Sequence, residues 1–194
     1  IKDVNRAVQK DVTITATQTK YRFEAGAAQV EVSFLSPLIA TSIDLLSRPV
    51  SFISFKVNAT NNSSHDVQVY FGVSTALSVN KLSEKISTDL YENDKLYILK
   101  AGTKDQPVLK TKGDDVRINW GYVYAAVPKD KAAPQTINTF ESSIETFKSP
   151  DGDKDISIYP GRQLMLNTFF DFGKINAVAK EKYVMVAYDD LYSI

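Results

Sequence analysis

Hydrophobic and polar residues alternate with a period of two along most of the 194-residue chain. The pattern is clear in "KYRFEAGAAQVEVSF", residues 20–34, where two alternating runs are separated by a stretch around Gly26. Such runs predict strands with one buried face, and glycine between them predicts a turn. We therefore expect a β-hairpin here, with a shared apolar face formed by Tyr21, Phe23, Val30, Val32 and Phe34.

The segment 50–74 shows the same alternation. Two runs flank the polar stretch "NNSSHD" (61–66), and Asn and Ser are residues that favour turns. We predict a second hairpin, in which both apolar rows lie on the same face of the sheet. These rows consist of Ile53, Phe55, Val57 and Ala59 in the first run, and of Val67, Val69, Phe71 and Val73 in the second.

Other segments extend the same design. We expect further strands at 95–101, 116–127, 163–172 and 182–189, and short helices at 80–87 and 137–147. Many short strands joined by polar connections, with little helix, are typical of an antiparallel sandwich. We therefore predict an all-β fold, a large, supersandwich-like antiparallel β-sandwich that forms a single domain over residues 1–194.

Composition narrows the possible functions. The chain has 23 Lys and Arg residues and 23 Asp and Glu residues, so its formal net charge is zero. This balance argues against nucleic acid as the main partner, because nucleic-acid binding needs a cationic face. The absence of cysteine excludes a thiol nucleophile, disulfides and cysteine-based metal sites. No apolar run is long enough to span a bilayer, and no motif points to a cofactor.

The two ends suggest a domain excised from a larger polypeptide. The sequence begins at Ile1 rather than at methionine, and it stops immediately after a run that resembles a strand. We expect residues 184–194 to be the start of a following central domain.

His65 is the only histidine and therefore the first candidate for acid–base catalysis. It lies beside Asp66 at the end of the polar turn, and no G-x-S-x-G motif supplies a serine nucleophile. We interpret His65 as a turn residue that faces solvent, and we predict no catalytic residue in this chain.

Four residues are candidates for ligand binding. Trp120, Tyr122 and Tyr124 alternate along one predicted strand, so their side chains point the same way. Exposed, they would form a platform on which sugar rings stack; buried, they would belong to the core. Arg48 could bind a carboxylate or hydroxyl group of a ligand, although an ion pair with Asp44 is the interpretation we favour.

The acidic stretch "DGDKD" resembles the start of a calcium loop, with carboxylates at Asp151, Asp153 and Asp155. The rest of the loop does not match the EF-hand pattern: Ile156 stands where an EF-hand needs glycine, and Arg162 stands where it needs glutamate. We predict no dedicated metal site and keep adventitious calcium at the three aspartates as the alternative.

Several stretches resemble the secreted glutaminase family of the glutaminase A type, and more narrowly its N-terminal β-sandwich region, a domain of unknown function. They are "TQTKYRFEAGAAQVEVSFLSPL", "DLLSRPVSFISFKV", "HDVQVYFGVS", "NWGYVYAAVP" and "VMVAYDDLYSI". The resemblance implies an exported parent protein, periplasmic, at the cell surface or extracellular, that hydrolyses glutamine to glutamate and ammonia. It also implies that a central domain and a helical domain of the same polypeptide are partners of this region.

Three functions follow from these observations. The first is a non-catalytic sandwich domain that packs on the catalytic domain of a hydrolase and shapes it. The alternative is a carbohydrate-binding module of a protein similar to glycoside hydrolases. The third is that the chain itself hydrolyses an amide.

Overall fold

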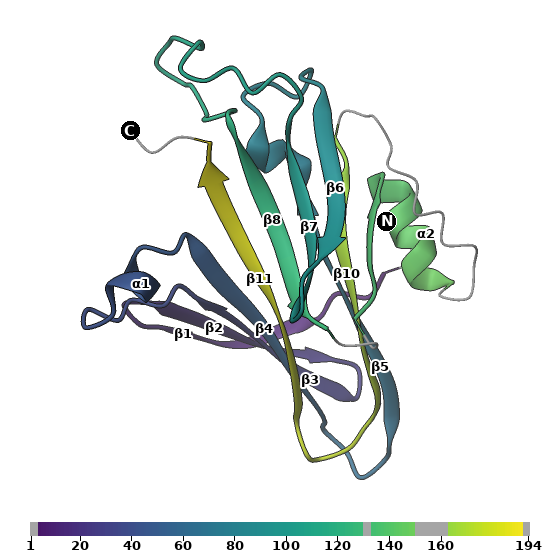
Figure 1. Ribbon diagram of the computed structural model, residues 1–194. Helices are drawn as coiled ribbons and strands as arrows, with labels where there is room; N and C mark the ends of the chain where they lie inside the picture. The colour runs from purple at the N-terminus through teal and green to yellow at the C-terminus, as the bar shows by residue number, and fades with distance from the viewer. Residues whose placement is uncertain (1–3, 130–132, 150–162, 192–194) are drawn as a thin grey trace. The chain divides into compact units, whose positions relative to one another are not determined.

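The structure is a computed structural model that describes residues 4–129, 133–149 and 163–191. In this part of the chain, eleven strands form two sheets (Figure 1) with the orders β1-β2-β3-β4-β11-β8-β7-β6 and β5-β10-β9. This arrangement confirms the predicted all-β antiparallel sandwich with little helix. The strands are β1 (Val8–Ile14), β2 (Gln18–Ala25), β3 (Ala28–Leu35), β4 (Val50–Ala59), β5 (His65–Ser74), β6 (Ile86–Glu92), β7 (Leu96–Thr103), β8 (Gly121–Pro128), β9 (Gln135–Asn138), β10 (Met165–Ile175) and β11 (Lys180–Asp190).

The chain divides into two compact units. The first unit comprises residues 1–69 and 171–185, and the second comprises residues 70–170 and 186–194. Strands β1 to β4 belong to the first unit, and β6 to β9 belong to the second. Strands β5, β10 and β11 contribute one part to each unit. The two units are described separately below.

In the first unit, the predicted hairpin of β2 and β3 is confirmed. The strands pair antiparallel from Gln18↔Leu35 to Ala25↔Ala28, which leaves a turn of two residues. Gly26 has φ +60° in this turn, a conformation that suits the first central position of a two-residue hairpin loop and that glycine adopts without strain.

Strand β4 carries the buried row of the first unit. Ile53, Phe55, Val57 and Ala59 are each at most 8% exposed, as their alternation predicts. Strand β4 pairs antiparallel with β3, for example through Val32↔Phe55. Because directly opposite residues share a face of the sheet, the apolar residues of β3 continue this row.

The predicted second hairpin, between β4 and β5, is wrong. Strand β4 lies between β3 and β11, whereas β5 pairs with β10 in the other sheet. The polar turn between the two strands therefore connects two sheets rather than two neighbouring strands. Alternation determines which face of a strand is buried, but it does not select the strand that supplies the hydrogen bonds.

Strand β1 is the edge strand at one end of the larger sheet. Its register with β2 shifts between Gln9 and Asp11, which leaves Lys10 as the extra residue of a bulge. The ammonium group of Lys10 forms an ion pair with Glu24 at 2.8 Å. All seven residues of this strand are exposed to solvent.

The core of the second unit is built on the inner faces of β7 and β8. Strand β8 alternates strictly between buried and half-buried residues. The buried apolar residues that β7, β8, β9 and β10 contribute to this unit are all at most 4% exposed. They are Leu99, Ala101, Val123, Ala125, Val127, Ile137, Leu166 and Phe170.

The helices agree with the prediction only in part. Helix α2 (Phe140–Lys148) is confirmed and begins after the N-cap Thr139, whose side chain accepts a hydrogen bond from the amide of Ser142. The predicted helix at 80–87 is wrong: the carboxylate of Glu84 accepts hydrogen bonds from the amides of Asn80 and Lys81, which closes a turn instead. Strand β6 begins directly after it. Two short helices were not predicted, α1 (Ile43–Leu46) and the 3-10 helix η1 (Thr75–Ser78).

Two leucines that lie directly opposite each other in β6 and β7 provide a test of this core. Leu99 is fully buried, whereas Leu90 is 38% exposed. We expect Leu99→Ala to lower the free energy of unfolding by about 2–5 kcal/mol, because it removes buried methyl groups and leaves a cavity. Leu90→Ala should cost about 1 kcal/mol or less. Guanidinium unfolding of both variants checks this, and equal losses would contradict the assigned burial.

Candidate functional site

His65 is the first residue of β5. Its Nε2 atom lies 2.8 Å from the side-chain oxygen of Asn61, which fixes the imidazole within the turn. The described contacts of His65 include no serine and no carboxylate. The geometry therefore assigns His65 to the turn and offers no nucleophile next to it.

The three candidate calcium ligands, Asp151, Asp153 and Asp155, lie outside the described residues. Within the described part of the chain, no group of three or more His, Cys, Asp or Glu side chains could hold a metal ion. Among the helices of that part, none combines the length and the apolar character needed to cross a membrane.

The structure separates the three aromatic residues that were predicted to share one face. Trp120 lies just before β8 and is 5% exposed, so its ring is part of the core. Tyr122 and Tyr124 are half-buried on the face of β8 opposite its buried row, with ring centroids 6.4 Å apart and planes tilted by 58°. Of these three aromatic residues, Tyr122 and Tyr124 are the two that remain candidates for ligand binding.

Arg48 is exposed in the short connection between α1 and β4, in the first unit. Among the ion pairs of the described residues, none joins Arg48 to Asp44. The expected ion pair is therefore not formed, and a ligand-binding role for Arg48 stays a prediction.

The register of three neighbouring strands adds charged residues to the two tyrosines (β6, β7 and β8 in Figure 1). Lys100 of β7 lies directly opposite Asp89 of β6 on one side and directly opposite Tyr124 of β8 on the other. Opposite residues share a face, so these side chains gather on the outer face of the sheet. We call this surface the tyrosine face; it comprises Asp89, Tyr91, Lys100, Tyr122 and Tyr124, with Asp189 of β11 beside them.

Lys100 determines which ring of the tyrosine face is accessible. Its ammonium nitrogen lies 3.7 Å from the ring centroid of Tyr122 but 6.0 Å from that of Tyr124. A cation over an aromatic face is attracted to the negative charge of the π system. The ammonium group therefore lies mainly over the ring of Tyr122, and the ring of Tyr124 is the less covered of the two.

Gly102 allows the ring of Tyr122 to lie against the backbone of β7. A Cβ atom at this position would be 2.6 Å from the Cδ1 atom of Tyr122 and 2.5 Å from the backbone oxygen of Gly121. Any side chain at position 102 would push the ring away. The position of Tyr122 thus depends on the absence of a neighbouring side chain.

Electrostatic effects link Tyr91 and Tyr124 to the neighbouring groups of the tyrosine face. Burial raises the pKa of Tyr124, and the charges of Tyr91, Asp189 and Tyr122 add to this effect. Burial also raises the pKa of Tyr91, with a further contribution from Asp89. At neutral pH both hydroxyl groups keep their protons and can donate hydrogen bonds.

Three members of the tyrosine face were not singled out by sequence analysis: Asp89, Tyr91 and Lys100. Asp89 and Tyr91 lie on β6, which was not predicted as a strand, so their register could not be assigned. Lys100 was part of a predicted strand, but only its pairing with β8 places it beside the tyrosines.

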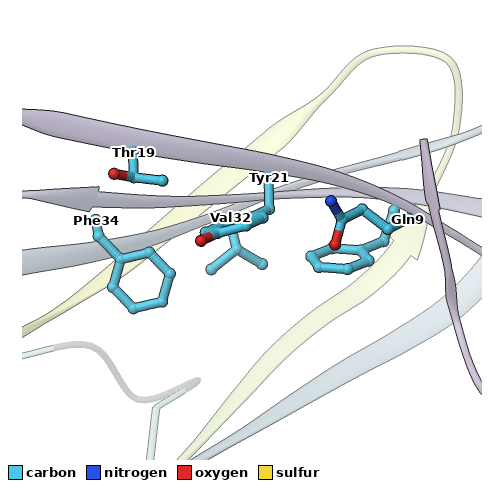
Figure 2. Close-up of a pocket in the computed structure, with 6 residues that line it drawn as sticks. Gln9, Thr19, Tyr21, Val32 and Phe34 are labelled. Atoms are coloured by element: carbon cyan, nitrogen blue, oxygen red, sulfur yellow. The ribbon is translucent and has the colours of Figure 1, made fainter. Parts of the chain in front are cut away.

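A second candidate site is a shallow groove in the first unit, on the face of β1, β2 and β3 shown in Figure 2. Its volume is about 520 Å³. The rings of Tyr21 and Phe23 lie nearly parallel with centroids 6.1 Å apart, and Phe34 meets Tyr21 edge-on at the same separation. We call it the aromatic groove; it is lined by Gln9, Thr19, Tyr21, Phe23, Val32 and Phe34.

The aromatic groove corrects the expectation that the β2–β3 hairpin has a fully buried face. The row that is buried on β4 becomes more exposed toward the edge of the sheet: Phe34 on β3 is 43% exposed, and Ile14 on β1 is 72% exposed. Apart from the hydroxyl of Tyr21, no titratable group lines the groove. The groove is therefore suited to apolar groups, and its lining offers no carboxylate, imidazole or amine for acid–base catalysis.

Comparison with models of known protein families assigns this chain to a family. The model of the family described as "Domain of unknown function (DUF5127)" matches residues 17–194. The chain belongs to the DUF5127 family. No curated protein sequence matches it.

This match corrects the expected membership of the secreted glutaminase family, which is wrong. DUF5127 is described only as a domain of unknown function, and its description assigns no glutaminase activity. The description as a domain of unknown function and the β-sandwich are retained. An exported parent protein, neighbouring domains in the same polypeptide and a single domain over residues 1–194 stay predictions.

Three solved structures resemble the DUF5127 chain distantly. A protein provisionally named as a kojibiose phosphorylase from the human microbiome shares 8% identity at a TM-score of 0.45, over 89% of this chain and 17% of that one. Heparan sulfate lyase HepC from Pedobacter heparinus shares 9% identity at a TM-score of 0.46, over 99% of this chain and 23% of that one. A protein provisionally named as an aldose 1-epimerase from Escherichia coli K12 shares 6% identity at a TM-score of 0.49, over 96% of this chain and 69% of that one.

These likenesses are too distant to support an argument about function. The chain spans less than a quarter of the length of the first two proteins. The function proposed for the DUF5127 chain therefore rests on its own side chains.

Tyr188 of β11 provides a test of the described geometry by pH. Its hydroxyl donates a hydrogen bond to the backbone oxygen of Ile118 (3.3 Å), and burial together with the charge of Asp190 raises its pKa from 10.0 to about 12. Between these pH values the unfolded chain loses the proton that the folded chain keeps. The free energy of unfolding must therefore fall as pH rises through this window.

We expect Tyr188→Phe to make this fall shallower, because the variant has no hydroxyl group to ionise at this position. Guanidinium unfolding at a series of pH values from neutral to alkaline measures the slope. Tyr183→Phe, which changes an exposed tyrosine of the same strand, serves as the control. Identical slopes for wild type and Tyr188→Phe would show that Tyr188 is not buried as described.

Proposed function

We propose that this DUF5127 chain is a non-catalytic module that binds carbohydrate through the tyrosine face. The observation that supports this proposal is the combination of two half-buried tyrosine rings with carboxylates and an ammonium group on one open sheet surface. The described residues around it include no paired nucleophile and base, so binding is the chemistry that the surface supports.

Sugars match such a surface in two ways. One face of a pyranose ring carries C–H groups that pack on the π face of an aromatic ring. Its hydroxyl groups donate hydrogen bonds to carboxylates and accept them from ammonium and phenol groups. On the tyrosine face, Asp89 and Asp189 provide acceptors, while Lys100 and Tyr91 provide donors.

We expect different roles for the two tyrosines. The ammonium group of Lys100 lies mainly over Tyr122, so a sugar ring that stacks without displacing it must use Tyr124. Tyr122 then holds the ammonium group of Lys100 through the cation–π contact and so keeps it beside the bound sugar. An open face of this kind suits a segment of an extended chain better than a single small molecule enclosed on all sides.

A second candidate function is packing against another part of a larger polypeptide, which the aromatic groove favours. A contiguous apolar surface that stays exposed is typical of one that another layer covers. Hydrogen exchange of the amides in β1 to β3, measured in this chain and in a longer natural polypeptide, tests this function. Slower exchange in the longer polypeptide would support it, and equal exchange would reject it.

The carbohydrate proposal predicts a specific loss of affinity. Tyr124→Ala should weaken binding of oligosaccharides by about tenfold or more, because it removes the stacking ring. Tyr122→Ala should weaken binding less, since it acts through Lys100. Screening the wild-type chain against a panel of oligosaccharides and titrating the best ligand by calorimetry measures both effects.

Two controls make this experiment decisive. Tyr183→Ala removes an exposed tyrosine of the first unit and should leave the affinity unchanged. Unfolding curves of all variants show whether they are folded. If no oligosaccharide binds to the wild type, or if Tyr124→Ala binds as tightly as the wild type, the proposal fails.

A further inference from the structure

We infer that the tyrosine face takes uncharged glycans and discriminates against glycans that carry carboxylate or sulfate groups. This inference rests on the proposed function and concerns the same residues, but it follows from a different property, their charges. The tyrosine face has two carboxylates, Asp89 and Asp189, and one ammonium group, that of Lys100. These three groups together carry a net negative charge, which an anionic ligand stacked on Tyr124 would meet.

One carboxylate, that of Asp189, acts directly on the ring on which a sugar would stack, and the other, that of Asp89, lies two strands from it. Asp89 is separated from Tyr124 only by Lys100, which lies directly opposite both of them in the sheet. Asp189 is near enough to Tyr124 to raise its pKa, and Asp89 is near enough to Tyr91 to do the same. A ligand on Tyr124 is thus flanked by negative charge from β6 and from β11.

Lys100 does not compensate for both carboxylates. Its ammonium nitrogen lies closer to the ring centroid of Tyr122, at 3.7 Å, than to that of Tyr124, at 6.0 Å. Among the ion pairs of the described residues, none joins Lys100 to Asp89, although the two residues are cross-strand neighbours. Both carboxylates therefore remain available as acceptors for the hydroxyl groups of a neutral sugar, and both repel an acidic one.

The expected discrimination is modest because the charges are partly exposed. Interactions between exposed charges are weakened by solvent and fall off over about 8–10 Å at physiological ionic strength. Two such charges make a neutral glycan bind roughly three- to tenfold more tightly than an acidic glycan of the same length. High salt should reduce this ratio, whereas stacking and hydrogen bonding should depend on salt much less.

The test compares a neutral gluco-oligosaccharide with an oligouronate of the same length and linkage. Their dissociation constants for the wild-type chain are measured by calorimetry at low and at high salt. Asp89→Asn keeps an acceptor oxygen but removes one negative charge, so it should bring the ratio of the two affinities closer to one. Lys100→Met should increase the discrimination, because it removes the only positive charge of the tyrosine face.

Asp66→Asn is the matched control. It changes the net charge by the same amount, but Asp66 is an exposed residue of the first unit and is not among the groups that act on Tyr91 or Tyr124. This variant should keep the ratio of the wild type. If Asp66→Asn changes the ratio as much as Asp89→Asn does, the effect comes from total charge and the inference fails.

The possible results separate this inference from the proposed function. If neither ligand nor any other oligosaccharide binds, the proposed function fails, and the inference fails with it. If both ligands bind but the oligouronate binds as tightly as the neutral glycan or more tightly, carbohydrate binding is retained and the charge selection is rejected. A preference for the neutral glycan that becomes smaller at high salt and in Asp89→Asn supports both carbohydrate binding and charge selection.

Discussion

The burial of one row of side chains on each central strand is the constraint on which the rest of this structure depends. Successive side chains of a strand point to opposite faces, so a strand that buries one row must present the other row outward. On β8 the buried row holds Val123, Ala125 and Val127, which forces Tyr122 and Tyr124 to the outer face. The position of the candidate site is therefore a consequence of the core.

Much of the fold could be predicted from this periodicity, but pairing between distant strands could not. The β2–β3 hairpin was predicted because its two runs are separated by a glycine turn. The β4–β5 hairpin was equally plausible from local sequence, yet β4 pairs with β3 and β11 instead. Strand partners are chosen by long-range burial, which a local pattern does not encode. The helix predicted at 80–87 failed because the side chain of Glu84 closes a turn with the backbone.

The candidate site was predictable only as far as single residues. Tyr122 and Tyr124 could be named from their spacing, and Trp120 shared that spacing but is buried before the strand begins. Lys100 and Asp89 reach the tyrosines only through the register of three strands. The resemblance to glutaminases led to the wrong family, and the description of the family that does match assigns no activity.

The edge strand β1 combines an apolar neighbourhood with features that disfavour pairing with another strand. An apolar surface beside a row of backbone groups without strand partners would invite another chain to extend the sheet, the first step of many aggregates. The bulge at Lys10 interrupts the even spacing of these groups, and the charge of Lys10 and its ion pair with Glu24 would have to be desolvated. A charged residue in a bulge at the edge thus disfavours extension of the sheet by another chain, although the neighbouring surface is apolar.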